Sequence, residues 1–236
     1  MNEDWFSPSD VNNPVTRSIL LVHSYPIPFV KIPTMNPKSP NTPRRSNARE
    51  KLLDTAFDLV YIHGYAATSV DMILKAAGVP KGSLYHHFGS KKALVTAMIR
   101  ERLFPRMDRF FPFRRKEGCV VTESIRDLYA AMARNRPLIT YGCPLYRLMV
   151  ELSPVDGEFD ALLLTKYRQL HADLAALLRE GIERGEYCDE LDAENFAATM
   201  LSATWGVLSL SPSVSSPENF LDQTRFLLEK LEEYSR

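Results

Sequence analysis

The sequence has few cysteines and no long apolar run. Its three cysteines, Cys119, Cys143 and Cys188, match no common metal-site spacing. Their odd number also argues against a disulfide framework, so we expect three reduced thiols. No stretch of about eighteen apolar residues occurs, which excludes a membrane-spanning helix. The N-terminal residues are too weakly basic for a secretory signal, and we therefore expect a cytoplasmic protein.

A net charge is also absent, because 29 Lys and Arg residues balance 29 Asp and Glu residues. The balance is an average of two different parts of the chain. Residues 43–117 carry 15 basic and 7 acidic residues, whereas residues 118–236 carry 11 basic and 19 acidic residues. This asymmetry is expected when one part of a protein meets nucleic-acid phosphates and the other part does not.

No alternating strand pattern occurs, and helical periodicity dominates from residue 47 onward. Apolar residues recur there every three or four positions, as they do on the buried face of a helix. The pattern predicts helices over residues 47–63, 70–77, 81–87, from 91 onward, 158–184, 193–210 and 217–234. The predicted fold class is all-α.

Residues 1–46 have a different composition. Half of the sixteen prolines lie in this segment, and no amphipathic period persists through them. We expect a disordered or basic N-terminal arm. Met35 lies within it, and every recognisable pattern follows Met35, which makes this residue a possible true start of translation.

Residues 68–92 read TSVDMILKAAGVPKGSLYHHFGSKK and contain the most informative motif. Thr68 is predicted to cap one short helix, and Ser90 to cap the helix that follows the motif. Between them, Gly78 supplies the backbone conformation of a tight turn. Two short helices joined in this way form a helix-turn-helix, whose second helix can lie in the major groove of DNA.

The second helix of this motif has one apolar and one polar side. Leu84 and Phe88 fall on the side that faces the core. The residues left toward solvent are Lys81, Gly82, Ser83, Tyr85, His86 and His87. A cation, a short hydroxyl and aromatic donors suit base edges and phosphates. A metal site at the histidine pair is rejected, because adjacent helical side chains point about 100° apart.

The segment from about residue 49 to residue 103 resembles the TetR family of transcriptional regulators. The shared patterns are G-Y-x-x-T-S-V-x-x-I and A-A-G-V-x-K-G-S-L-Y-H-H-F-x-S-K. Pro80 departs from the family, in which Ser is common at this position. The resemblance implies a helix-turn-helix three-helix DNA-binding domain over residues 47–92 and a helical effector-binding and dimerisation domain over residues 93–236. It also implies a repressor that binds double-stranded operator DNA, with no enzymatic activity, cofactor or metal.

The resemblance implies DNA-binding roles for particular residues. The residues expected to contact phosphates are Thr68, Tyr85, His86 and Lys92. The residues expected to approach bases are Lys81, Gly82 and Ser83. Arg44, Arg45 and Arg49 look like the basic arm that some relatives place near the minor groove.

The family also implies a homodimer and an effector cavity. A two-fold dimer through the last two helices would hold two DNA-binding heads about 34 Å apart; alternatively, these helices only close the monomer core. The expected ligand-binding residues are aromatic or sulfur-containing, apart from one histidine: Phe104, Met107, Phe111, Met132, Tyr141, Tyr146, Met149, Tyr167, His171 and Trp205. Such side chains suit a small, mostly apolar effector, although each could equally be plain core.

Three other readings remain open from the residues. The same regulator could sense oxidants through Cys143, if a nearby helix N-terminus favours its thiolate. An enzyme could use Cys143, His171 and Asp173, but the last two lie two positions apart on one helix and diverge. A helical adaptor would show no salt-dependent affinity for duplex DNA.

Overall fold

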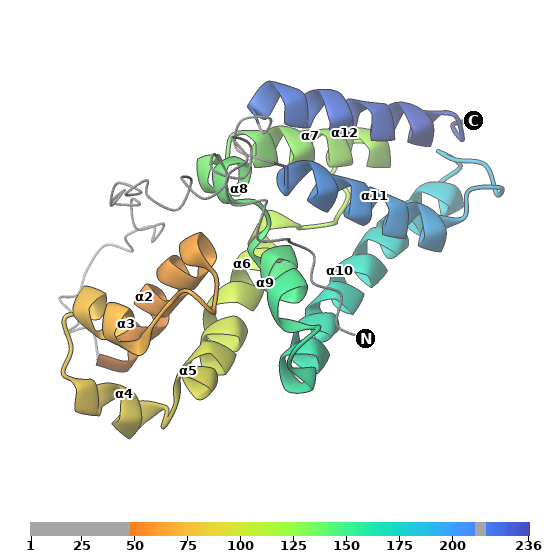
Figure 1. The fold of residues 1–236 in the computed structure, drawn as a ribbon. Helices are drawn as coiled ribbons and strands as arrows, with labels where there is room; N and C mark the ends of the chain where they lie inside the picture. Colours follow the sequence, from red (N-terminus) through yellow and green to blue (C-terminus); the bar gives the residue numbers. More distant parts are fainter. Residues whose placement is uncertain (1–47, 211–215) are drawn as a thin grey trace, which may run out of the picture. The chain divides into compact units, whose positions relative to one another are not determined.

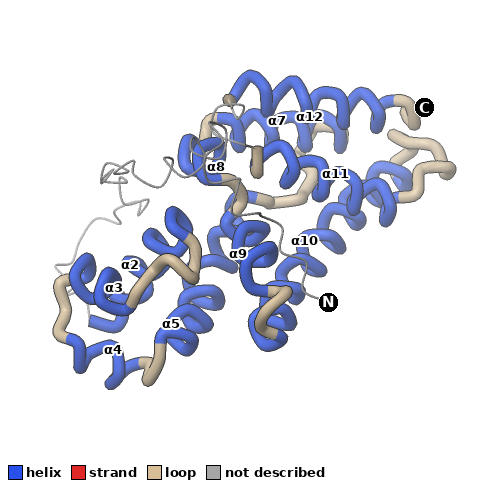
Figure 2. Tube along the Cα trace, in the orientation of Figure 1, coloured by secondary structure: helices blue, strands red, loops and turns tan. Residues whose placement is uncertain are grey.

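A computed structural model describes residues 48–210 and 216–236, which belong to one of the two units of the chain, residues 45–236. Its helices are α2 (Ala48–His63), α3 (Val70–Ala77), α4 (Lys81–His87), α5 (Lys91–Met98), the π-helix η3 (Ile99–Leu103), α6 (Phe104–Phe110), α7 (Val121–Ala133), α8 (Arg136–Tyr141), α9 (Pro144–Leu152), α10 (Gly157–Glu183), α11 (Ala193–Leu208) and α12 (Pro217–Glu232). Within these ranges the only β-structure is an isolated bridge between Tyr187 and Ser235. The all-α prediction is confirmed (Figure 1, Figure 2).

Helix α2 is the support on which the N-terminal helices pack. It contacts α3, α4 and α5. Its buried apolar residues, spaced by three or four positions, include Leu52, Leu53, Ala56, Phe57 and Val60. Gly64 follows the helix with a φ of 84°, a conformation that glycine adopts without strain and that commonly ends helices.

Helices α3 and α4 form the predicted helix-turn-helix. Ser69 caps α3 by accepting a hydrogen bond from the backbone N–H of Met72, so the prediction that Thr68 is the cap was wrong. Gly78 ends α3 with a φ of 63° and a ψ of 39°, as the turn requires. Helix α4 begins and ends at the predicted residues, and Leu84 anchors it with a fully buried side chain.

Helices α5, η3 and α6 follow one another without a break. The predicted cap Ser90 accepts a hydrogen bond from the backbone N–H of Ala93. The π-helical turn η3 then widens the helix where it leaves the N-terminal helices. Such π-helical turns are rare in proteins, and those that occur often lie at functional sites.

Ion pairs join η3 to the first half of α2. Glu101 accepts hydrogen bonds from the guanidinium of Arg49 at 2.5 and 2.8 Å. Arg102 lies 2.6 Å from carboxylate oxygens of both Glu50 and Asp54. Two arginines and three carboxylates therefore fix η3 against the helix that supports the helix-turn-helix.

The remaining helices build a second packed group. Helix α10 packs against α9 and α11, and α12 packs against α7. Figure 1 shows α7 and α12 running side by side. The predicted bounds differ from the observed ones by no more than a few residues: residues 158–184 for α10, 193–210 for α11 and 217–234 for α12. Each of these helices begins after a capping side chain, from Asp156, Asp192 and Ser216 respectively.

Gly181 allows a close packing of α10 against the chain that follows it. The ring of Tyr187 is 1% exposed, and a Cβ added at Gly181 would lie 2.5 Å from a carbon of that ring. The Tyr187 hydroxyl forms a 2.6 Å hydrogen bond with the hydroxyl of Thr122 on α7. A glycine is thus required at this position because the aromatic ring occupies the space of a side chain.

Candidate DNA-binding surface and effector site

Helix α4 presents most of the predicted DNA-binding residues to solvent. Leu84 turns inward and is fully buried, which fixes the opposite face outward. The exposed residues of that face are Lys81, Gly82, Tyr85 and His86, and Ser83 is half-buried beside them. Tyr85 is 51% exposed, whereas large aromatic side chains are usually more buried than this. The surface therefore combines a cation, a hydroxyl and aromatic donors on one short helix.

Three of the predicted DNA-binding residues are engaged elsewhere. Thr68 is fully buried, and its hydroxyl donates a 2.7 Å hydrogen bond to the carbonyl of Gly64. Its role here is to hold the turn between α2 and α3, not to present a side chain to phosphate. Arg49 binds Glu101, as described above, and Lys92 pairs with Asp156 and Glu158. The predicted arm residues Arg44 and Arg45 lie outside the described residues.

Lys91 has a structural role that sequence reasoning missed. Its ammonium donates a 2.6 Å hydrogen bond to the carbonyl of Tyr65 and lies 4.1 Å from the centre of the same residue's ring. Burial lowers the pKa of Lys91 below its ordinary value. The ring of Tyr65 in turn packs edge-on against Phe159 on α10. This chain of contacts links the start of α5 to the second group of helices.

The predicted ligand-binding residues divide between the core and one aromatic cluster. Met107, Phe111 and Met132 are buried, and Phe104, Tyr141 and Met149 are partly buried against the core. The structure brings Tyr146, Tyr167 and Trp205 together, with the Trp205 ring centre 5.5 Å from that of Tyr146 and 5.7 Å from that of Tyr167. His171 lies at the edge of this cluster, where Nε2 is 3.0 Å from the carbonyl oxygen of Glu194.

Trp205 carries a polar atom that has no partner among the described residues. The indole Nε1 is buried, and no acceptor within the described ranges lies in hydrogen-bond distance. A buried unpaired N–H costs about 1–3 kcal/mol. An acceptor atom on a bound molecule would remove this cost.

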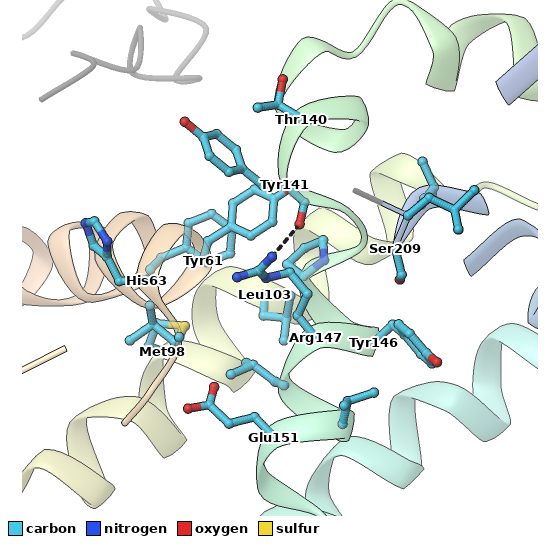
Figure 3. Close-up of a pocket in the computed structure, with 18 residues that line it drawn as sticks. Tyr61, His63, Met98, Leu103, Thr140, Tyr141, Tyr146, Arg147, Glu151 and Ser209 are labelled. Carbon is cyan, nitrogen blue, oxygen red and sulfur yellow. Dashed lines mark hydrogen bonds between the residues drawn. The ribbon is translucent and has the colours of Figure 1, made fainter. Parts of the chain in front are cut away.

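A separate cavity of about 490 Å³ lies beside Tyr141 and Tyr146, and Figure 3 shows the side chains around it. Of the predicted ligand-binding residues, only these two line it among those described. The other walls come from α2, α5 and η3, from α9, and from the end of α11. Sequence reasoning missed Tyr61, Arg147 and Glu151 here, because nothing local marks residues that meet across more than eighty positions of the chain.

Two regions of the sequence match models of one protein family. Residues 52–98 match "Bacterial regulatory proteins, tetR family". Residues 116–221 match "Tetracyclin repressor-like, C-terminal domain". An uncharacterised HTH-type transcriptional regulator encoded in the lacX 3' region of Lactococcus lactis subsp. lactis is 31% identical over 140 residues, which cover 58% of this chain and 68% of that protein. The chain belongs to the TetR family.

Other TetR relatives match over most of their length. The HTH-type transcriptional repressor DhaR of Mycobacterium sp. (strain GP1) is 28% identical over 180 residues, which cover 76% of this chain and 89% of DhaR. The crystal structure of a TetR transcriptional regulator from Chloroflexus aurantiacus J-10-FL has a TM-score of 0.71 and 23% sequence identity, and covers 80% of this chain and 96% of that one. The protein is thus a DNA-binding transcriptional regulator and not an enzyme.

Within this TetR protein, Cys143 lacks the environment of a thiolate sensor. It does occupy the N-cap position of α9, as the redox hypothesis required. Its side chain is nevertheless fully buried, and burial raises the pKa of the thiol to about 12, although backbone N–H groups of Tyr146 and Leu145 oppose this shift. Burial therefore outweighs the helix N-terminus, and this setting does not favour the thiolate that the redox alternative needs.

Among the described residues of this TetR chain, no group of three or more His, Cys, Asp or Glu side chains could hold a metal ion. The rings of His86 and His87 lie 4.9 Å apart without a third potential ligand. In the same ranges, no helix is both long and apolar enough to cross a membrane.

Proposed function

We propose that the protein is a homodimeric repressor that inserts α4 into the major groove of an operator and leaves it when a small, mostly apolar ligand binds. The observation that supports DNA reading is the exposed face of α4. On this proposal Lys81, Gly82 and Ser83 approach bases, while Tyr85 and His86 contact phosphates. The proposed domains remain residues 47–92 for DNA binding and 93–236 for effector binding and dimerisation.

The exposed side of α12 supports a dimer through the last two helices. Leu221 and Phe226 are 40% and 56% exposed on this helix, although large apolar side chains are usually covered. On α11, the exposed residues include Ser202 and Gly206, whose small size permits close approach of another helix. A dimer that reads two successive major grooves must hold its two copies of α4 about 34 Å apart.

The aromatic cluster of Tyr146, Tyr167 and Trp205 supports an apolar ligand with at least one acceptor. The rings offer an adaptable surface, and the unpaired Trp205 indole N–H offers one hydrogen bond. Repression is proposed because DhaR, which the chain resembles over 89% of that protein's length, carries the name of a repressor.

Binding to duplex DNA from upstream of the protein's own gene, titrated with salt, tests the DNA-binding half. Affinity should fall steeply as salt rises, because bound phosphates release counterions. Tyr85→Ala should weaken binding to all sequences, whereas Ser83→Ala should change the preference among sequences. Arg168→Ala, an exposed cation on α10, is the control and should bind as the parent does. Equal binding by all four proteins would refute the assignment.

Compounds that release the protein from operator DNA test the ligand-binding part of the proposal. Trp205→Phe removes the indole N–H but keeps an aromatic ring, so it should weaken the response to such compounds while leaving operator affinity unchanged. Ligand binding and DNA binding must oppose each other by the same factor. The proposal fails if no compound that binds the second group of helices lowers operator affinity.

A further inference from the structure

The cavity in Figure 3 lies at the junction between the helix that supports the helix-turn-helix and the second group of helices. Phe57, Val60 and Tyr61 reach it from α2, and Leu148 and Leu208 reach it from α9 and α11. Its volume of about 490 Å³ falls within the range of sites that bind small molecules. Trp205 and Tyr167 do not line it, although Tyr146, the third member of the aromatic cluster, forms part of its wall.

Arg147 gives this cavity a positive charge that no carboxylate of the described residues neutralises. Its guanidinium donates hydrogen bonds to the carbonyls of Tyr141 at 3.0 Å and of Ile62 at 3.4 Å. The second distance is long for an N–H···O hydrogen bond. No Asp or Glu oxygen within the described part of the chain lies within 4.0 Å of this guanidinium. A half-buried arginine held only by neutral carbonyls is a strong site for a carboxylate, which can bind it through two hydrogen bonds.

The rest of the wall suits an apolar body attached to that charge. The rings of Tyr61 and Tyr141 meet edge-on, with centres 5.7 Å apart, next to the guanidinium in Figure 3. Phe57, Val60 and Leu148 are buried and contribute only apolar surface. A ring or a short aliphatic chain would remove this surface from water.

Glu151, the one carboxylate among the described residues that line the cavity, already has hydrogen-bond partners. It accepts hydrogen bonds from the backbone N–H groups of Tyr65 and Ala66 at 2.9 and 2.7 Å. In Figure 3 its carboxylate lies toward Met98, apart from the Arg147 guanidinium. Its charge is therefore stabilised by the turn after α2 and does not serve as the partner of Arg147.

We infer that this cavity binds a small organic monoanion with an apolar body, and that its occupation is transmitted to the DNA-binding helices. The carboxylate replaces the Ile62 carbonyl as a partner of Arg147. Because Ile62 lies in the last turn of α2, this exchange loosens one tie between α9 and the support of the helix-turn-helix. This inference rests on the proposed function for its effect on operator binding, but not for the binding of the anion.

Binding is measured by calorimetry on the full chain at pH 7 with matched probes. The carboxylates are benzoate, phenylacetate and the straight chains from butyrate to decanoate, and each is compared with its neutral amide. Carboxylates should bind about tenfold more tightly than their amides, since a charge-assisted pair is lost in the amide. Arg147→Met should abolish this difference, whereas Arg168→Met should keep it.

A second pair of variants avoids any dependence on the folding of Arg147→Met. Val150 lines the cavity and is 59% exposed, so Val150→Trp can fill the cavity without disturbing the core. Val155 is 77% exposed and does not line it, which makes Val155→Trp the matched control. Only Val150→Trp should lose carboxylate binding and the carboxylate-induced fall in operator affinity.

Absence of binding by every carboxylate, equal binding by the amides, or full binding by Val150→Trp would overturn the inference. Carboxylate binding that leaves operator affinity unchanged would overturn its transmission to DNA. The salt titration of ligand-free protein on operator DNA is independent of all these results, so a failure of the proposed function is recognised separately.

Discussion

The ammonium of Lys92 lies 2.8 Å from Oδ2 of Asp156 and also 3.0 Å from a carboxylate oxygen of Glu158. The resemblance to TetR proteins assigns Lys92 to a DNA phosphate, yet this structure pairs it with the start of α10. A phosphate and these two carboxylates would compete for the same ammonium. The pair thus connects the first turn of α5, which follows the helix-turn-helix, to the second group of helices.

Releasing Lys92 should strengthen DNA binding. Asp156→Asn removes the negative charge but keeps an acceptor for the N-cap of α10, and Glu158→Gln changes a residue whose side chain is 84% exposed. We expect each variant to bind operator DNA about two- to fivefold more tightly at low salt, with a smaller gain at high salt. Fluorescence anisotropy at two salt concentrations measures this. Asp160→Asn, on the same helix but outside the pair, is the control, and unchanged affinity in both variants would contradict the competition.

Substitution of Phe226 should separate the proposed dimer. Phe226→Asp places a charge on the exposed apolar side of α12, where burial against a second copy would be unfavourable. We expect monomers and a fall in operator affinity of roughly 100-fold or more, since two half-sites are no longer bound together. Sedimentation and DNA binding measure the two effects. Val155→Asp, at an exposed apolar residue outside α12, should remain dimeric. A dimeric Phe226→Asp would place the interface elsewhere.

Gly181→Ala should destabilise the second group of helices. The added methyl group would lie 2.5 and 2.6 Å from two carbons of the Tyr187 ring, which must then move away from its hydrogen bond with Thr122. We expect a loss of about 1–3 kcal/mol in the free energy of unfolding. Gly157→Ala on the same helix has open space around its Cβ and is the control for urea denaturation. Equal urea midpoints for the two variants would show that the Tyr187 ring moves aside without a loss of stability.

The pair between Arg49 and Glu101 should produce a defined pH dependence. The hydrogen bond from Arg49 holds the pKa of Glu101 below its ordinary value of 4.5. Because the folded state releases this proton more readily than the unfolded state, the pair's stabilisation is present above about pH 4.5. It is lost as the pH falls through the lower folded value.

Glu101→Gln should therefore be less stable than the parent at pH 7, and the difference should shrink as the pH falls below about 4.5. We expect a difference of less than about 1 kcal/mol at pH 7, because both side chains are partly exposed and solvent screens the pair. Thermal unfolding at pH 7, 5 and 3 measures it, with Glu123→Gln on α7 as the control. A stability difference of the same size at all three pH values would rule out the ion pair as its cause.

Cys143 should not respond to mild oxidants. Its thiol is fully buried with a pKa of about 12, whereas Cys119 and Cys188 are partly exposed. A thiol reagent should label Cys119 and Cys188 in the native protein and Cys143 only after denaturation. Peroxide should change operator binding of the parent and of Cys143→Ser equally. A response present in the parent and lost in Cys143→Ser would instead support the redox hypothesis.

Local features of the sequence determined the helices and the outward face of α4. The spacing of apolar residues, Gly78 at the turn and Ser90 at the start of α5 act within a few positions of the chain, where the backbone geometry of a helix dictates which residues share a face. For this reason α4 was predicted with the observed bounds, and Leu84 was correctly assigned to the core.

Tertiary structure alone decided the partners of the polar residues. Lys92 meets Asp156, Arg147 meets the carbonyl of Ile62, and the Trp205 indole N–H is buried without an acceptor in the described ranges. The first two contacts join positions more than sixty residues apart, and no periodicity or short motif encodes which distant groups will meet. They arise from the packing of whole helices, which sets each buried or half-buried charge beside the acceptors that remain within its reach.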